Sequence, residues 1–365
     1  MPATLRMILL LLCVSPLAAA AEDFDPPLEE GEFLVDAYSQ ASGHVRTTLF
    51  YIPQSVPPRS RTLVIVAHGG GEEDVVELLN RMRRTGWNEV AKRDGFVVAY
   101  PTALKDPDDP DARYNWNDGR LGTDIWAMPD NEDIDDVGYF SDLISAAQAH
   151  YGVGDRVYVI GISNGGYMAY RLAMDPRANP RLRAIGTVVA QIPTDIFALG
   201  LPAPTPLFAV AGSEDPLVPF NGGPVTIQLE LEDGTPVGAP LVESTVTSFA
   251  ETVELFLLHN GCDAGRVTNG TLPDGANDGT YVEFFGFRRC TQTGAAGQLA
   301  DVSAYVVWGG GHRWQGRGGN GPQEVRSRRT DTVAGVEVEY YITGGLSTQD
   351  GFDATESAWA FFRRH

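Results

Sequence analysis

VYVIGISNGGYMAYRLAM, residues 157–174, joins a strand pattern to a helix pattern through a glycine-bounded serine. Residues 157–160 are apolar and mostly β-branched, which favours a buried strand. Met168, Ala169 and Leu172 recur at helical spacing beyond the turn, which predicts a helix. A buried strand followed at once by a helix is the repeating unit of a parallel sheet, so this stretch favours an α/β fold.

The turn of this stretch is GISNG, with Ser163 between Gly161 and Gly165. In a G-x-S-x-G turn between a strand and a helix, the serine hydroxyl is held clear of the sheet, and glycines remove the Cβ atoms that would clash. The positive end of the helix then lies where charge develops on a substrate oxygen. In a chain with 41 glycines the pattern also arises by chance, and the alternative is an ordinary serine in a glycine-rich turn. The strand–helix context favours Ser163 as a nucleophile.

Strand and helix patterns alternate on both sides of this stretch. Further strands are predicted at residues 45–52, 62–67, 96–100, 184–190, 207–211, 280–287 and 302–308, and helices at residues 74–84, 87–93, 134–151, 248–260 and 353–362. This alternation predicts an α/β fold with a mostly parallel central sheet covered by helices on both faces. Residues 222–243 interrupt it as a predicted β-hairpin insertion with a turn at Asp233-Gly234, and residues 317–345 form a second insertion without clear pattern.

Composition limits the classes of partner. The 365 residues are 43% hydrophobic and 21% charged, as in ordinary globular proteins, and we expect one catalytic domain at residues 45–365 after a lead-in at residues 22–44. The chain has 27 Lys and Arg against 48 Asp and Glu, a formal charge of −21. Such a surface repels phosphate backbones, so we expect no nucleic-acid partner.

Residues 1–21 have the pattern of a signal peptide. Arg6 is the only charge, residues 7–14 are an apolar run, and four alanines follow as cleavage sites. The run is too short to span a bilayer comfortably, and Leu12 before Cys13 does not fit a lipoprotein signal. We therefore expect a secreted protein, extracellular or periplasmic, without a membrane anchor.

Cleavage of the signal peptide would leave two cysteines, Cys262 and Cys290. An even pair in an exported chain predicts one disulfide, and two free thiols are the alternative. The acidic loop at residues 105–117 contains DPDDPD, but its prolines break the ligand spacing of a calcium loop. We expect no metal site.

A serine nucleophile needs a histidine base and an acid that orients it, and in α/β-hydrolases the chain order is Ser, Asp or Glu, His. Of the six histidines, three precede Ser163, His259 lies in a predicted helix, and His365 is the last residue. His312 remains, in the glycine-rich loop GGGHRWQG directly after a predicted strand. For the acid we favour Asp215, which follows the strand at residues 207–211, over its rivals Asp195 and Glu214.

The oxyanion formed on attack needs backbone N–H donors. The N–H of Asn164, the residue after Ser163, is the expected first donor. The second is expected from HGGG at residues 68–71, from Gly69 or Gly70, because this loop follows an early buried strand. The alternative for three glycines is a flexible turn.

Three aromatic residues are candidates for lining a substrate subsite: Trp116, Tyr139 and Trp314. Aromatic residues at such positions are more often part of the core or of the rim of a site. Both interpretations stay open from the sequence.

The motifs together resemble the secreted esterases of the polyhydroxybutyrate depolymerase-like and feruloyl esterase-like group of α/β-hydrolases. The matching segments run in order from about residue 63 to the C-terminus: VAHGGGE (66–72), GFVVAYP (95–101), DDVGYFSDLI (135–144), RVYVIGISNGGYMAYRLA (156–173), GSEDPLVPFNGG (212–223), HNGC (259–262), GGGHRWQG (309–316) and ATESAWAFF (354–362).

The resemblance implies a triad of Ser163, Asp215 and His312, a Cys262–Cys290 bridge, and an extracellular ester hydrolase without a cofactor. The expected substrate is a small ester, an oligoester or a polysaccharide-linked ester, with hydroxyalkanoate, feruloyl or acetyl groups, and we expect a monomer. The chain departs from the group's usual pattern around the tryptophan of GGGHRWQG. Arg313 and Gln315 stand where such proteins often have Thr and Pro.

Other functions fit the same residues. An acyltransferase or a serine peptidase would use the same triad. A non-catalytic carbohydrate-binding relative would keep the fold, although an intact ordered triad argues against it.

Overall fold

The computed structural model describes residues 6–7, 31–54, 61–71, 74–105, 112–121, 134–316, 326–333, 336–348 and 351–365. Most of the predicted signal peptide and the DPDDPD segment lie outside these residues. Within them, no helix combines the length and the apolar character needed to cross a membrane.

The main sheet of the described residues has eleven strands in the order β1-β2-β3-β5-β4-β6-β7-β8-β13-β12-β11. Its strands are β1 (Arg6–Met7), β2 (Gly31–Tyr38), β3 (Val45–Ile52), β4 (Arg61–Ala67), β5 (Val97–Pro101), β6 (Val153–Ile162), β7 (Ala184–Val188), β8 (Leu207–Gly212), β11 (Val267–Leu272), β12 (Tyr281–Phe287) and β13 (Val302–Trp308). The six strands from β5 to β13 in this order are parallel, and antiparallel strands β2, β3, β11 and β12 extend the sheet on both sides.

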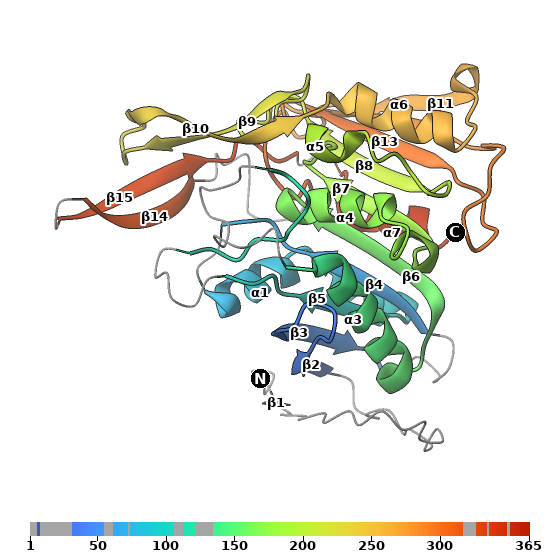
Figure 1. The fold of residues 1–365 in the computed structure, drawn as a ribbon. Coiled ribbons are helices and arrows are strands. Elements are labelled where there is room, and N and C mark those ends of the chain that lie inside the picture. Colours follow the sequence, from blue (N-terminus) through green and yellow to red (C-terminus); the bar gives the residue numbers. More distant parts are fainter. Residues whose placement is uncertain are drawn as a thin grey trace.

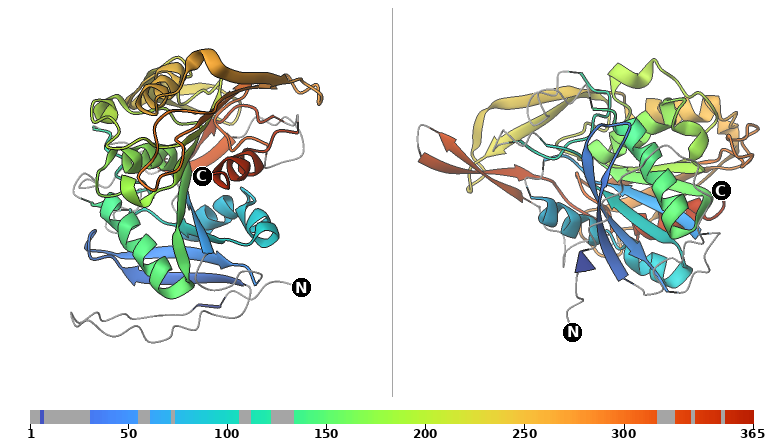
Figure 2. Two further views of the ribbon diagram at one scale, coloured as in Figure 1. Left: turned by 90° about the vertical axis from the view of Figure 1, so that its right-hand side faces the viewer. Right: turned by 60° about the horizontal axis from the view of Figure 1, so that its bottom comes forward.

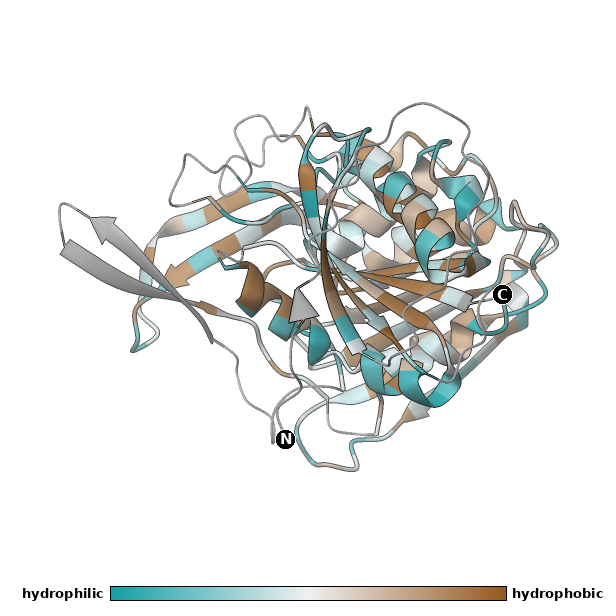
Figure 3. Ribbon diagram, turned by 90° about the horizontal axis from the view of Figure 1, so that it is seen from below, coloured by the Kyte–Doolittle hydropathy of each residue, from teal (hydrophilic) through white to brown (hydrophobic). Residues whose placement is uncertain are grey.

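Helices cover both faces of this sheet (Figure 1). The described helices are α1 (Val75–Arg83), α2 (Trp87–Asp94), α3 (Asp136–Tyr151), α4 (Asn164–Met174), α5 (Thr194–Phe197), α6 (Phe249–His259) and α7 (Ala354–Phe362), with 3₁₀ turns η2 (Asn179–Arg181) and η3 (Ala264–Arg266). One core cluster contains side chains of α3, α4 and α6, and a second contains side chains of α1, α2 and α7. Figure 3 shows hydrophobic residues along the central strands between these two layers. The predicted fold class, an α/β-hydrolase fold, is confirmed.

Three strands of the main sheet have no counterpart in the sequence prediction, and one of them, β1, lies within the predicted signal peptide. β2 lies within the segment expected to be a lead-in, and β11 precedes β12 at the opposite edge of the sheet. Both are partly exposed along most of their length, with burial patterns that do not alternate cleanly. A weak alternation is the physical reason why neither strand stands out in the sequence.

The two insertions form one second sheet. The first is the predicted hairpin, β9 (Gly223–Glu230) and β10 (Pro236–Val246), and Gly234 in its turn has a φ of 84°. The second contains an unpredicted hairpin, β14 (Arg326–Val333) and β15 (Val336–Thr343). Tyr341 of β15 pairs with Glu230 of β9, which gives the strand order β10-β9-β15-β14. We call these four strands the insertion sheet, and they project from the main sheet in Figure 1 and in the right-hand view of Figure 2.

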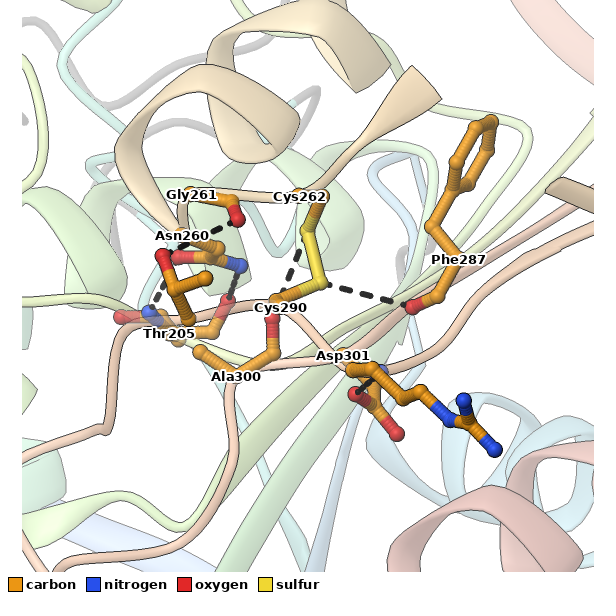
Figure 4. Close-up of a disulfide and its surroundings, with 10 residues drawn as sticks. Thr205, Asn260, Gly261, Cys262, Phe287, Cys290, Ala300 and Asp301 are labelled. Carbon is orange, nitrogen blue, oxygen red and sulfur yellow. Dashed lines mark hydrogen bonds between the residues drawn. A yellow bond between two sulfur atoms is a disulfide. The ribbon is translucent and has the colours of Figure 1, made fainter. Parts of the chain in front are cut away.

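The predicted disulfide between Cys262 and Cys290 is confirmed (Figure 4). It links Cys262, just after α6, to Cys290, just after β12, and the two cysteines are separated by 28 positions in the sequence. Next to it, the Asn260 amide accepts the Thr205 N–H at 3.0 Å and donates to the Thr205 carbonyl at 2.8 Å. The disulfide and the buried amide together attach the end of α6 to the main sheet.

Candidate active site

Ser163 occupies a strained turn between β6 and α4. Its φ is 53° and its ψ is −123°, a conformation that non-glycine residues rarely adopt. Its N–H donates to the Val188 carbonyl at 3.1 Å, and its carbonyl accepts the Tyr167 N–H at 2.9 Å. Strain of this kind persists only where surrounding structure enforces it, which is typical of functional sites.

Glycines make this turn sterically feasible. A Cβ on Gly161 would collide with the carbonyl of Gly165, and a Cβ on Gly165 would collide with the carbonyls of Ala67 and His68. The turn is therefore packed backbone against backbone on the end of β4. This packing fits the structural setting that the G-x-S-x-G pattern predicts.

Asp215 and His312 are in direct contact at the same edge of the sheet. Ser163, Asp215 and His312 follow the carboxyl ends of the parallel strands β6, β8 and β13. His312 Nδ1 lies 2.8 Å from Asp215 Oδ2, and the Asp215 side chain is only 2% exposed. The other carboxylate oxygen, Oδ1, accepts the N–H groups of Leu217 and Val218, both at 2.9 Å. In the described residues no hydrogen bond joins Ser163 Oγ to His312.

The residues that were alternatives to Asp215 and His312 do not take part in this contact. Asp195 Oδ2 accepts the N–H of Leu121 at 3.1 Å, and the side chain of Glu214 is exposed. His259, at the end of α6, is also exposed. Among the residues with described side chains, no cluster of His, Cys, Asp and Glu could hold a metal ion.

The HGGG loop lies against the serine turn. A Cβ on Gly69 would lie 3.4 Å from Ser163 Cβ, and a Cβ on Gly70 would lie 3.5 Å from Asn164 Cβ. The two segments from which oxyanion donors are expected are thus neighbours, as donors to one oxygen must be.

His68 orients the peptide between Gly69 and Gly70. His68 Nδ1 lies 2.7 Å from the Gly69 carbonyl oxygen, and Nε2 lies 2.9 Å from the Ala103 nitrogen. The Ala103 N–H can only donate, so Nε2 is the unprotonated acceptor and Nδ1 carries the proton that Gly69 accepts. In a trans peptide the N–H of Gly70 points away from the Gly69 carbonyl, which favours Gly70 as the second oxyanion donor.

The buried position of His68 keeps its imidazole neutral. Burial, together with the charge of Arg46, lowers the pKa of His68 to about 4 despite the opposing hydrogen bond to Gly69. Below the usual pKa of 6.5 the unfolded chain binds a proton here that the folded chain does not bind. The folded state therefore loses stability as pH falls from 6.5 towards 4 and regains it as pH rises.

We expect His68→Gln to weaken this pH dependence. The pKa of His68 is about 2.5 lower in the folded chain than its usual value of 6.5. This difference lowers the free energy of unfolding by as much as about 3 kcal/mol when the pH falls from 7.5 to 4. Glutamine keeps a donor and an acceptor but does not titrate. The measurement is urea unfolding at several pH values. The exposed His259→Gln is the matched control and should keep the wild-type pH slope, and an unchanged slope in His68→Gln would contradict the assignment.

The three aromatic candidates are covered by protein. Trp116 is 2% exposed, Tyr139 4% and Trp314 7%. Trp116 Nε1 donates to the His68 carbonyl at 3.0 Å, and Trp314 Nε1 donates to Thr355 Oγ1 at 2.9 Å. These contacts favour a packing role over the substrate contact that was the alternative in the sequence.

The side chain of Asn164 is held by the loop that contains Trp116. Asn164 Oδ1 accepts the Trp116 N–H at 2.7 Å, and Nδ2 donates to Asp118 Oδ2 at 2.6 Å. The sequence pattern does not mark Asp118, or Arg120 and Glu243 to which it is linked. The one signal for such partners was Asn164 itself. An amide side chain that is buried at the start of a helix needs hydrogen-bond partners from another part of the chain.

Gln315 has a structural reason to replace the expected proline. Its side chain is fully buried, its Nε2 donates to the Gly311 carbonyl at 2.9 Å, and its Oε1 accepts the Thr348 N–H at 3.2 Å. These bonds attach the His312 loop to the segment that follows the second insertion. No contact described for Arg313 explains its replacement of threonine.

The chain is similar to known esterases. No family model matches it. "Putative esterase NocK" of Nocardia uniformis subsp. tsuyamanensis is 29% identical over 312 residues, which cover 83% of this chain and 81% of that protein. "Bifunctional acetylxylan esterase/xylanase XynS20E" of Neocallimastix patriciarum is 26% identical over 188 residues, 51% of this chain and 24% of that protein. A solved structure of acetyl xylan esterase from Aspergillus awamori has a TM-score of 0.45 and 13% identity, covering 77% of this chain and 94% of that chain.

The strand order, the strained serine turn and the similarity to an esterase over most of the chain agree with the resemblance found in the sequence motifs. The chain has an α/β-hydrolase fold and is similar to esterases over most of its length, as these motifs indicated.

Proposed function

We propose that the chain hydrolyses carboxylic esters through an acyl-enzyme formed on Ser163, with His312 as base and Asp215 as its orienting acid. The observation that carries this proposal is the 2.8 Å contact between His312 Nδ1 and Asp215 Oδ2, at the sheet edge where the Ser163 turn lies. Because Nδ1–H donates to the carboxylate, Nε2 is left as the proton acceptor for the serine hydroxyl. Such catalytic hydrogen bonds are often long before substrate binds.

The reaction then follows from the positions of these groups. Ser163 Oγ attacks the ester carbonyl carbon while His312 Nε2 takes its proton, and the carbonyl oxygen becomes an oxyanion. The N–H groups of Asn164 and Gly70 stabilise that oxygen. Collapse breaks the bond to the alcohol, which leaves with the proton from His312. Water activated by His312 then attacks the acyl-enzyme and releases the acid and free Ser163.

For the substrate we propose an ester carried on a larger molecule, either an acetyl or feruloyl group on polysaccharide or a hydroxyalkanoate chain. Among these substrates we favour the acetyl ester of a polysaccharide, because one relative is named an acetylxylan esterase/xylanase. We further propose that the protein is secreted, supported by the signal pattern at residues 1–21 and by the Cys262–Cys290 disulfide, a bond typical of exported proteins.

A fluorophosphonate probe tests the proposal. We expect it to label Ser163 in the folded wild type, identified by peptide mass, and not in Ser163→Ala. Ser145→Ala, on the exposed side of α3, is the control and should label normally. A panel of acetylated xylan, methyl ferulate and hydroxybutyrate oligomers then ranks the substrates. A folded wild type that neither labels nor hydrolyses any ester would contradict the proposal.

A further inference from the structure

Arg120 links the first insertion to the loop beside the serine turn. Its Nη1 donates to Glu243 Oε2 of β10 at 3.0 Å, and its Nε donates to Asp118 Oδ2 at 2.9 Å. Its side chain is 6% exposed, and those of Asp118 and Glu243 are 3% and 18% exposed. Burial alone would lower the pKa of Arg120, but the two carboxylates outweigh it and raise the pKa, so the guanidinium stays charged.

Asp118 and Arg120 each contact a residue in the first turn of α4. Asp118 accepts the amide of Asn164 at 2.6 Å, and the Arg120 guanidinium lies 4.5 Å from the centre of the Tyr167 ring. Tyr167 in turn donates its backbone N–H to the carbonyl of Ser163. We call the connection Glu243–Arg120–Asp118–Asn164 the Arg120 relay. It ends on the residue whose N–H is proposed to hold the oxyanion.

The insertion sheet is also attached at the other end of the proposed site. The N–H of His312 donates to the Gly344 carbonyl at 2.6 Å, and the N–H of Gly311 donates to the Leu346 carbonyl at 2.8 Å. Gly344 follows β15 directly, and β15 pairs with β9 of the first insertion. One sheet is therefore joined to the His312 loop and, through the Arg120 relay, to the serine turn.

A buried ion pair adds little net stability, because desolvation offsets the attraction between the charges. Its fixed geometry, by contrast, can hold a neighbouring group in place. On the basis of the proposed function, we infer that Arg120 and Glu243 are positioning residues through which the first insertion fixes the Asn164 peptide as an oxyanion donor.

Glu243→Gln tests this inference because it keeps the shape of the side chain and removes its charge. A misplaced donor weakens the transition state more than the bound substrate. We expect kcat to fall about tenfold, with KM changed less than about twofold. Complete removal of one oxyanion donor lowers kcat by about 10²- to 10³-fold, and this substitution displaces the donor without removing it. The affinity for a trifluoromethyl ketone, whose adduct carries an oxyanion, should fall by a similar factor. Fluorophosphonate titration of Ser163 corrects kcat for the fraction of active protein.

Asp155→Asn is the matched control. Asp155 pairs with Arg183 at 2.6 Å near the start of β6, at the end of the strand away from Ser163. The Asp155→Asn variant should have the same kcat and the same affinity for the trifluoromethyl ketone as the wild type. Glu243→Asp, which keeps the charge on a shorter side chain, should lose less kcat than Glu243→Gln. If the glutamine variant does not fold, Glu243→Asp is compared with the wild type, and a kcat and ketone affinity equal to those of the wild type would then contradict the inference. Equal losses in Glu243→Gln and Asp155→Asn, or no loss in Glu243→Gln, would overturn the inference. Failure of the wild type to label at Ser163 would instead overturn the proposed function.

Discussion

Replacing Asp215 with asparagine is expected to reduce kcat for ester hydrolysis by about 10³- to 10⁴-fold while leaving the fold intact. The Oδ1 atom of asparagine can still accept the N–H groups of Leu217 and Val218, which fixes the rotamer. The amide nitrogen then faces His312 Nδ1, and two donors cannot bond each other. The imidazole must adopt its other tautomer, with a proton on Nε2, so it can no longer accept the proton of Ser163. Steady-state kinetics at pH 8 measure the loss, and circular dichroism checks the fold.

The rival acids supply the controls for this prediction. Glu214→Gln and Asp195→Asn remove a carboxylate of the same kind, one adjacent in sequence and one on α5, without touching His312. Each should keep kcat within about threefold of the wild type, because neither orients the base. A large loss in either, with Asp215→Asn active, would assign the acid to the other residue.

Gly165→Ala is expected to lower the free energy of unfolding by about 2–4 kcal/mol and to abolish most activity. The new Cβ would meet the backbone carbonyls of Ala67 and His68, at the end of the fully buried part of β4. Backbone atoms cannot rotate away as a side chain can, so the helix start and the HGGG loop must separate. That movement would pull apart the two segments proposed to hold the oxyanion. Urea unfolding followed by tryptophan fluorescence measures the change.

Gly286→Ala is the matched glycine substitution. A Cβ on Gly286, in β12, would lie 3.5 Å from the carbonyl oxygen of Thr268, an ordinary contact. The effect on unfolding should stay within about 1 kcal/mol, and activity should be unchanged. Similar losses in both variants would mean that alanine disturbs the fold wherever it replaces glycine, and the close packing at Gly165 would then have no special role.

Local sequence patterns were sufficient to predict most strands of the main sheet. The predicted strands at residues 45–52 and 302–308 match β3 and β13 residue for residue, because runs of β-branched and aromatic side chains mark buried strands without any help from partners. The predicted helices at residues 248–260 and 353–362 likewise begin at Ser248 and Asp353, which are the N-caps of α6 and α7. Chain order and a position directly after a predicted strand selected Asp215 and His312, and the structure brings these two residues into contact.

The sequence by itself determined the alternating α/β fold, the serine turn and the candidate acid and base, because each depends on neighbours within a few residues or on the order of strands. Tertiary structure decided the rest. Only the folded chain buries Trp116, pairs the two insertions in one sheet, and joins Arg120 to Glu243, 123 positions away. Contacts of that range leave no local pattern, since a polar side chain in a loop looks the same in sequence whether it faces solvent or a buried partner.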